Sequence, residues 1–156
     1  MDLRDINDQI AEIKRAQNLI KDRVDRMATR DVQNHSSGSW APTFTGFSAD
    51  PASPICRYVL IGKMCTCFVY LPNAGTSSSA TFAITAPFTA ATVAGQFWGS
   101  VFWNGVDNGA QLTTPGMVTI ASGGTAFYLS KTIAGGGGWT AANGKDASFT
   151  ITYEIA

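Results

Sequence analysis

A heptad repeat near the amino end of the chain is the feature that most constrains its fold. Between positions 3 and 27, apolar residues recur at alternating intervals of three and four residues, with one polar residue among them. This mean period of about 3.5 residues is typical of left-handed coiled coils, whose helices pack through their a and d positions. The residues predicted to form this seam between helices are Leu3, Ile6, Ile10, Ile13, Gln17, Ile20, Val24 and Met27.

The residues at the seam also indicate how many helices associate. If Leu3 is an a position, isoleucine occupies the d positions 6, 13 and 20. Isoleucine at d is unfavourable in a parallel dimer and shifts the preference to three or four strands, and a polar residue such as Gln17 at a central a position can set the register. The prediction is a parallel homotrimer, and a dimer is the alternative. A single amphipathic helix packed on its own domain is a further alternative, but such a helix usually has a wider apolar face.

Charged residues are concentrated in this same segment. Of the 11 acidic and 11 basic residues, seven of each fall within residues 1–31, which leaves four of each for the rest of the chain. The net charge is zero, so no long-range field favours nucleic acid or an anionic membrane surface. No apolar run is long enough to cross a membrane and no secretory signal is recognised, so we expect no membrane insertion and synthesis in a cytoplasm.

The rest of the chain has the pattern of an all-β domain. We expect a coiled-coil stem over residues 1–33, a polar linker over 34–40 and a jelly-roll-like antiparallel β-sandwich over 41–156, so that the protein as a whole is mainly β. Residues 147–156 alternate between apolar and polar, as in a strand with one buried face. The two strands expected within 58–71 differ, because residues 64–71 are apolar on both faces, which predicts a strand covered on both sides. Further strands are expected at 80–86, 95–103, 117–121 and 125–130, and turns at 72–75, 104–105 and 143–144.

The candidate catalytic and metal-binding residues point to neither activity. The only histidine, His35, lies in the expected linker, and the carboxylates of the β domain are isolated in sequence, whereas a glycosidase needs two that flank the bond. Cys65 and Cys67 lie on one side of a strand with Cys56 nearby, and we interpret them as buried free thiols because a closed zinc site needs four ligands. Residues 104–109 are interpreted as a hairpin turn rather than a calcium loop. We therefore expect no enzyme, no cofactor and no metal.

Aromatic and amide side chains supply the candidate ligand site. Trp139 follows four consecutive glycines and precedes a polar turn. Its ring is either exposed on a mobile loop, where it can stack on a sugar or contact a protein, or packed back over the sandwich. Trp98 and Trp103 are expected in the core or in contacts between subunits. The polar residues expected to accompany an exposed Trp139 are Asn104, Asp107, Asn108 and Asn143.

Four segments resemble a known group of proteins. These are "SWAPTFTGFS" (39–48), "YVLIGKMCTCFVY" (58–70), "GTSSSATFAITAPF" (75–88) and "FTITYEIA" (149–156). Together with the short coiled coil and its Ser/Gly joint, they resemble the virion fibre and receptor-binding proteins of tailed bacteriophages. The resemblance implies a trimeric jelly-roll-like head, assembly in the host cytoplasm, a place in the virion as a tail or head fibre, and attachment to other virion proteins through the helical end.

The resemblance leaves three functional hypotheses. The first is a fibre whose heads bind carbohydrate on the host surface, with avidity from three copies. The second is a capsid or tail decoration or assembly protein without receptor activity. The third is a tailspike-like enzyme acting on polysaccharide, for which the sequence offers no carboxylate pair. A cellular trimeric signalling domain of jelly-roll type is disfavoured by the missing secretory signal.

Overall fold

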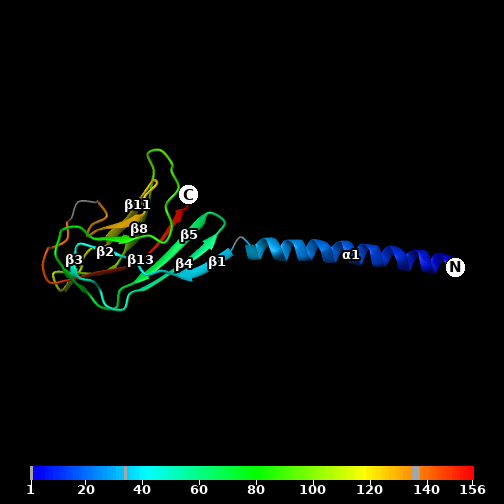
Figure 1. Cartoon of the computed structure of the whole chain (residues 1–156), viewed down its shortest axis with the longest axis horizontal. Coiled ribbons are helices and arrows are strands. Elements are labelled where there is room, and N and C mark those ends of the chain that lie inside the picture. The colour runs from blue at the N-terminus through cyan, green and yellow to red at the C-terminus, as the bar shows by residue number, and fades with distance from the viewer. Residues whose placement is uncertain (1, 34, 135–137) are drawn as a thin grey trace. The chain divides into compact units, whose positions relative to one another are not determined.

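The computed structural model describes residues 2–33, 35–134 and 138–156 of this 156-residue chain (Figure 1). The chain forms two compact units, Met1–Ser36 and Ser37–Ala156. We call them the helical unit and the β unit and describe each by itself. The described part of the chain contains no helix long and apolar enough to cross a membrane.

The helical unit contains helix α1, Leu3–Gln33, and the first two residues of strand β1 (His35–Ser39), which pairs within the β unit. The amide of Ile6 donates to the carbonyl of Asp2 at 3.3 Å, and Asp5 lies in the first turn, where a carboxylate is favoured by the helix dipole. The helix expected from the heptad repeat is confirmed. Its side chains are exposed at every position from residue 3 to residue 27.

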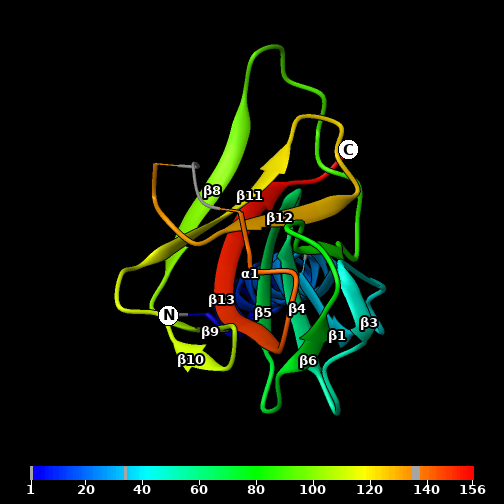
Figure 2. The same ribbon diagram turned by 90° about the vertical axis from the view of Figure 1, so that its left-hand side faces the viewer.

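The β unit consists of two antiparallel sheets (Figure 2). The larger sheet has the order β1-β4-β5-β13-β6-β3, with β9 paired to β13 and β10 paired to β9. Its strands are β1 His35–Ser39, β3 Phe47–Ala49, β4 Ile55–Ile61, β5 Met64–Tyr70, β6 Gly75–Ser77, β9 Asn104–Asp107, β10 Ala110–Gln111 and β13 Gly144–Glu154. The smaller sheet has the order β2-β7-β12-β11-β8. Its strands are β2 Phe44–Thr45, β7 Ala83–Thr85, β8 Phe97–Phe102, β11 Gly116–Ala121 and β12 Ala126–Ser130.

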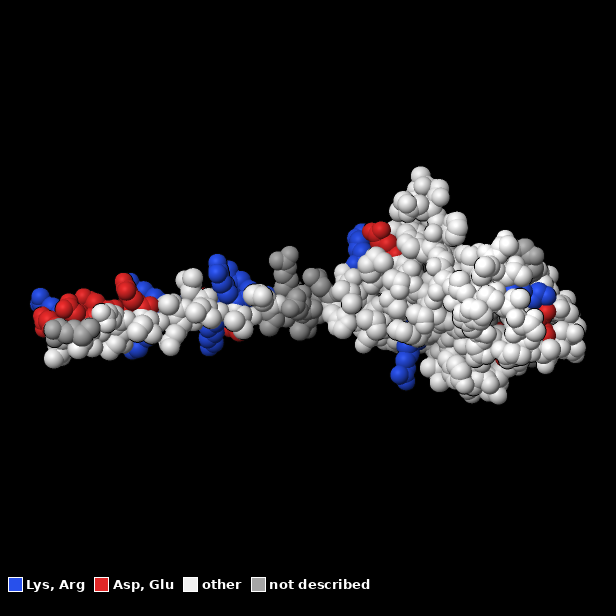
Figure 3. Space-filling view, turned by 180° about the vertical axis from the view of Figure 1, so that it is seen from behind, with Lys and Arg blue, Asp and Glu red and all other residues white. Residues whose placement is uncertain are grey.

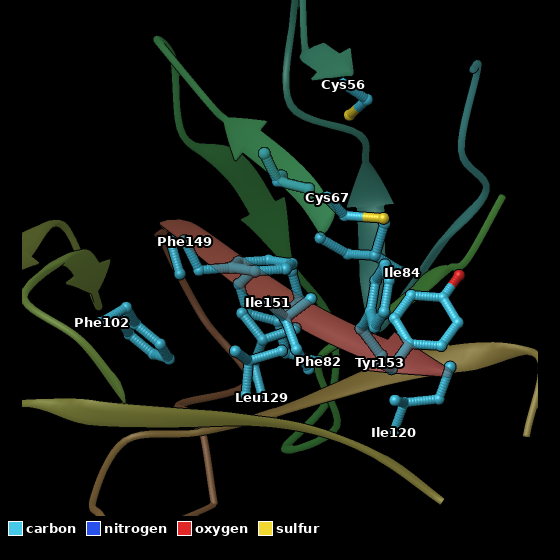
Figure 4. Packing of buried hydrophobic residues seen from close by; sticks show 14 of the residues in the cluster. Cys56, Cys67, Phe82, Ile84, Phe102, Ile120, Leu129, Phe149, Ile151 and Tyr153 are labelled. Atoms are coloured by element: carbon cyan, nitrogen blue, oxygen red, sulfur yellow. The ribbon is translucent and has the colours of Figure 1, made fainter. Parts of the chain in front are cut away.

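The core lies between the two sheets. The ring of Phe127 on β12 packs edge-on against Phe149 and Tyr153 of β13, with both pairs of ring centroids 5.7 Å apart. Figure 4 shows the β13 side chains pointing toward Ile120 and Leu129 of the smaller sheet. The alternation expected in residues 147–156 is therefore confirmed, and the mainly β character of the chain is confirmed with it.

One local expectation is wrong and another gains a detail. The segment expected as a linker, 34–40, contains the boundary between the two compact units and also strand β1 from residue 35 onward, and residue 34 lies outside the described residues. The Asn104–Gly105 pair does not form a turn but lies within β9. The turn between β9 and β10 is made instead by Asn108 and Gly109, whose φ angles of 54° and 77° are those of a two-residue hairpin turn.

One face of the larger sheet differs from the sequence expectation. Strand β5 buries Cys65, Cys67 and Val69, but its other face is uncovered in the single chain. Met64, Phe68 and Tyr70 are 45%, 45% and 50% exposed. The expectation of a strand covered on both sides is therefore not met within one copy of the chain.

Candidate functional site

The predicted seam residues form an exposed apolar stripe along α1. The seven apolar members are between 42% (Ile6) and 77% (Leu3) exposed, and Gln17 is exposed as well. Charged side chains share the rest of the helix surface with uncharged ones and are denser here than on the β unit (Figure 3). The described part of the chain leaves this stripe uncovered, so α1 presents a surface that can pack on another helix.

The polar residues predicted to bind a ligand lie in two adjacent strands and their loops. Asn104 and Asp107 lie on β9, and Asn108 lies in the turn that follows. Asn143 immediately precedes β13. The structure brings Asn108 and Asn143 together, because the Asn143 amide nitrogen donates to the Asn108 side-chain oxygen at 2.6 Å.

Asp107 is held by structural hydrogen bonds. Its Oδ2 accepts from Lys131 Nζ and from Thr140 Oγ1, both at 2.8 Å, and its Oδ1 accepts from the Thr140 amide at 2.8 Å. Burial acts to raise the pKa of this carboxyl group, but the hydrogen bonds and the Lys131 charge outweigh it, so the pKa is lowered. The carboxylate therefore ties the loop around residue 140 to β9 and has little capacity left for a ligand.

Asn104, Gln111, Asn108 and Asn143 form two exposed amide pairs. Gln111 Nε2 donates to Asn104 Oδ1 at 3.2 Å at the start of β9, and the Asn108–Asn143 pair described above lies past its other end. An amide has two donor hydrogens and an acceptor oxygen, so each pair keeps hydrogen-bonding capacity toward solvent. Such groups can bind the hydroxyl groups of a sugar.

The expectation of an exposed Trp139 is wrong, and the alternative, a ring packed on the sandwich, is confirmed. Trp139 is 3% exposed, and its indole N–H donates to the Leu129 carbonyl at 2.8 Å. Its ring packs edge-on against Phe82 at 5.0 Å between centroids and stacks with Phe102 at 6.4 Å. The burial of the ring leaves no aromatic face for a sugar. Of the glycine run, residues 135–137 lie outside the described residues.

Lys145 is a buried charged residue that the sequence analysis did not identify. It is 0% exposed, and its Nζ donates to three carbonyl oxygens, those of Gly46 (2.8 Å), Ser79 (3.1 Å) and Thr81 (2.8 Å). Burial lowers its pKa to about 8, and the charge of Asp107 opposes that shift. All three ammonium hydrogens are engaged, so Lys145 holds these loops together and has no donor for a ligand. The buried members of the alternation are residues 147, 149, 151 and 153. Extending it back by two residues would have placed residue 145 on the buried face.

The three cysteines are buried free thiols, as predicted. Cys65 and Cys67 are 0% exposed with their sulfur atoms 3.6 Å apart, and Cys56 is 3% exposed. Burial raises the pKa of all three thiols, that of Cys56 to about 11, so they stay protonated at neutral pH. Among the described residues, no group of three or more His, Cys, Asp or Glu side chains could hold a metal ion.

A groove of about 510 Å³ lies where the outer face of β4, β5 and β13 meets β8 and the residues that follow it. Its walls include Tyr70 and Phe68 from β5, Val101 from β8 and the adjacent Trp103, which is 75% exposed. Arg57 is the only charged residue in the lining. Trp103 is therefore not a core residue of this chain, and its place in contacts between subunits stays a prediction.

The described part of the chain thus presents the helical stripe, the amide pairs and the groove as uncovered surfaces. No protein-family model matches the sequence, and no curated protein matches it. The functional argument therefore depends on the geometry of these surfaces.

Proposed function

We propose that this chain is a homotrimeric fibre protein of a bacteriophage virion. Three α1 helices form a parallel coiled-coil stem, and three jelly-roll-like heads face away from the particle and bind carbohydrate on the host surface. The observation that carries the proposal is the apolar stripe of α1, which has the period of a coiled coil and is exposed along its whole described length.

The physical argument for the stem concerns the source of its stability. Most of the stability of protein helices comes from packing an apolar face, and isolated helices in water are marginal. The side chains of α1 are exposed from residue 3 to residue 27, so the helical unit supplies no such packing itself. Each large apolar side chain that becomes buried contributes roughly 1.5–3 kcal/mol, and association through the seam provides that burial.

The argument for a binding head concerns the two amide pairs. Strand β1 runs beside β4, and Trp40, which follows β1, donates its amide to the carbonyl of Cys56 at the start of β4. The first residue of β1 therefore lies toward the other end of β4, so the chain enters the β unit near the β4–β5 turn. The β9–β10 turn and residue 143 lie at the other end of the larger sheet, where Gly109 donates to the Gly144 carbonyl. A site of exposed amides binds sugar weakly, and three copies on one stem raise the overall affinity through avidity.

A sedimentation experiment tests the trimer. We expect the full chain at micromolar concentration to have three times the monomer mass of 16.5 kDa. Ile13→Asp, at the seam, is expected to give monomers because a carboxylate cannot be buried there. Leu19→Asp is the matched control, because Leu19 is similarly exposed (65% against 57%) but lies outside the seam. A wild-type chain that sediments as a monomer would contradict the proposal.

Labelling of particles tests the place of the protein in the virion. Antibody against the β unit is expected to decorate intact phage particles, with the label projecting from the capsid or tail surface. Binding of the trimer to a glycan array, reduced in an Asn108→Ala, Asn143→Ala variant of unchanged mass, would support the carbohydrate site. Equal binding by both proteins would remove the amide pairs from the proposal.

A decoration protein without receptor activity is the second candidate. The observation that favours it is the uncovered apolar face of β5, because such faces usually contact another protein. Cryo-electron microscopy of the particle separates the two, since a decoration protein has its β units packed on the particle surface and a receptor-binding fibre has them free.

A further inference from the structure

The β unit has two uncovered apolar patches on different strands. The first, which we call the β4–β5 face, consists of Ile55, Ile61, Met64, Phe68 and Tyr70, each between 45% and 62% exposed. Strand pairing places Ile55 opposite Tyr70 and Ile61 opposite Met64, so these side chains are neighbours on one side of the sheet. The half-buried Val59 and Thr66, which are opposite each other, lie between the pair of Ile61 and Met64 at one end and Phe68 at the other.

The second patch, which we call the β8 edge, consists of Phe97, Val101 and Trp103, which are 65%, 49% and 75% exposed. Among the described strands, β8 pairs only with β11 and ends the order of the smaller sheet. Strand β13 of the same chain lies close to β8, so what this patch leaves uncovered is its apolar side chains. Large uncovered apolar side chains of this kind mark contacts with other proteins.

The composition of the two patches is that of a protein–protein interface. Aromatic residues, methionine and arginine are enriched in the centres of such interfaces, and lysine and acidic residues are depleted. The groove between the patches follows this pattern, with Arg57 as its only charged residue. Taking about 200 Å² for a whole aromatic side chain, the exposed rings of Phe97 and Trp103 offer roughly 280 Å² on the β8 edge, and those of Phe68 and Tyr70 roughly 190 Å² on the β4–β5 face. Each partner in a stable interface of standard size buries about 800 Å², so the rings alone supply about a third of this area on one side and about a quarter on the other.

We propose that a second copy of this chain covers this surface, with the β8 edge of one β unit packed on the β4–β5 face of the next. A cyclic trimer needs two different, complementary patches on each subunit, whereas a two-fold dimer needs one self-complementary patch. The inference rests on the proposed trimer, because the coiled coil holds the β units at a high effective concentration. It extends that proposal from the stem to the heads.

The same observations weigh against a sugar in the groove. The lining is mainly apolar, and Ile61, Met64 and Phe97 of the two patches lie outside the groove. A bound sugar would leave those three residues uncovered, whereas a neighbouring β unit covers them.

Hydrogen exchange of the full-length chain tests the inference. We compare wild type with Tyr70→Glu, which places a charge on the β4–β5 face. The matched control is Tyr128→Glu, because Tyr128 is similarly exposed (54% against 50%) but lies on β12, with β11 between it and β8. The backbone amides of β8 that are not paired with β11 are the readout, because a neighbouring copy packed on this patch slows their exchange beyond what β13 of the same chain provides.

The expected result is slow exchange of these amides in wild type and in Tyr128→Glu, and exchange at least roughly tenfold faster in Tyr70→Glu, since the covered edge opens. All three proteins keep the trimer mass, because the stem is intact. A wild-type trimer whose β8 amides exchange as fast as in Tyr70→Glu contradicts the proposed interface between β units but not the coiled-coil trimer. Loss of glycan binding in Tyr70→Glu, with mass and exchange unchanged, also overturns it and assigns the groove to carbohydrate. A wild-type monomer removes the proposed function as well, so the two failures are distinguishable.

Discussion

The two units of the chain place their large apolar side chains in opposite environments. In the β unit, Phe127, Ile120 and Tyr153 are 0% exposed and are covered by residues from both sheets. In the helical unit, Leu3 and Met27 are 77% and 67% exposed. The β unit therefore contains within one chain the contacts that stabilise its core, whereas the packing partners of α1 must come from outside the unit. The stability of the β unit is therefore independent of protein concentration, and if α1 associates as we propose, the stability of the helical unit depends on it.

The largest expected effect concerns the β unit, whose stabilising contacts all lie within one chain. Phe127→Ala removes the ring that contacts both Phe149 and Tyr153. We expect a loss of about 3–5 kcal/mol in the free energy of unfolding of the β unit, because a buried cavity remains. Urea denaturation followed by near-ultraviolet circular dichroism measures it. The loss should be the same at low and high protein concentration.

A substitution at the seam tests whether the stability of α1 depends on protein concentration. Ile20→Ala is expected to cost roughly 2 kcal/mol per chain, because the isoleucine is buried only in the associated helices. The thermal midpoint of the helical signal should fall, and it should rise again with protein concentration. Leu19→Ala is the control and should leave this midpoint nearly unchanged. Equal effects of the two variants would show that the stripe is not the contact surface.

Lys145 tests how far the β unit depends on a buried charge. Lys145→Met keeps the length of the side chain but leaves the carbonyls of Gly46, Ser79 and Thr81 without their donor. We expect a loss of roughly 1.5–3 kcal/mol in the free energy of unfolding. Lys63→Met, on an exposed lysine in the β4–β5 turn, is the matched control and should cost little. A similar loss in both variants would mean that the carbonyl contacts are unimportant.

Alkaline pH gives the smallest and most specific test. An unfolded lysine holds its proton up to about 10.5 and folded Lys145 only to about 8, so this group makes the β unit more stable as pH rises above 8. The buried thiols have the opposite sign. Their pKa values are raised from 9.0, so above pH 9 the unfolded chain has lost protons that the folded chain retains, and stability falls.

Deprotonation of the three thiols lowers the stability with rising pH, and deprotonation of Lys145 raises it. Because there are three thiols and one lysine, the free energy of unfolding, measured with a reductant present, is expected to peak near pH 9. Cys67→Ala should make the decline above the peak shallower by at most about 1.4 kcal/mol per pH unit. The comparison uses slopes, so the cavity that alanine leaves does not affect it. A decline as steep as that of wild type would exclude Cys67 as a source.

The sequence predicts those parts of the fold whose signal is periodic. The heptad repeat located α1, and alternation identified the buried residues of β13 from residue 147 onward but not Lys145. Strand β1 was missed because its Ser- and Gly-rich residues pair through the backbone with β4, and side-chain patterns do not report backbone pairing. A turn was predicted at residues 104–105, whereas the structure has it at Asn108–Gly109. An Asn-Gly pair occurs at both ends of β9, and only the pairing register of the strands decides which pair forms the turn.

The candidate site was harder to predict than the fold. Trp139 was misplaced because its partners, Phe82 and Phe102, lie far from it in sequence, whereas its neighbouring glycines indicated a loop. Asn108 and Asn143 were correctly grouped, since both occur in turn motifs. The exposed face of β5 was detectable as an excess of apolar residues, but whether one chain or several cover it is not encoded in a local pattern.

The placement of the cysteines has a practical consequence. All three thiols of the chain lie in the β unit and are buried, and the helical unit has none. A maleimide dye therefore reacts only when the β unit opens, regardless of whether the helices are associated. Pulse labelling with such a dye can therefore measure the fraction of chains whose β unit is open, and no engineered cysteine is needed.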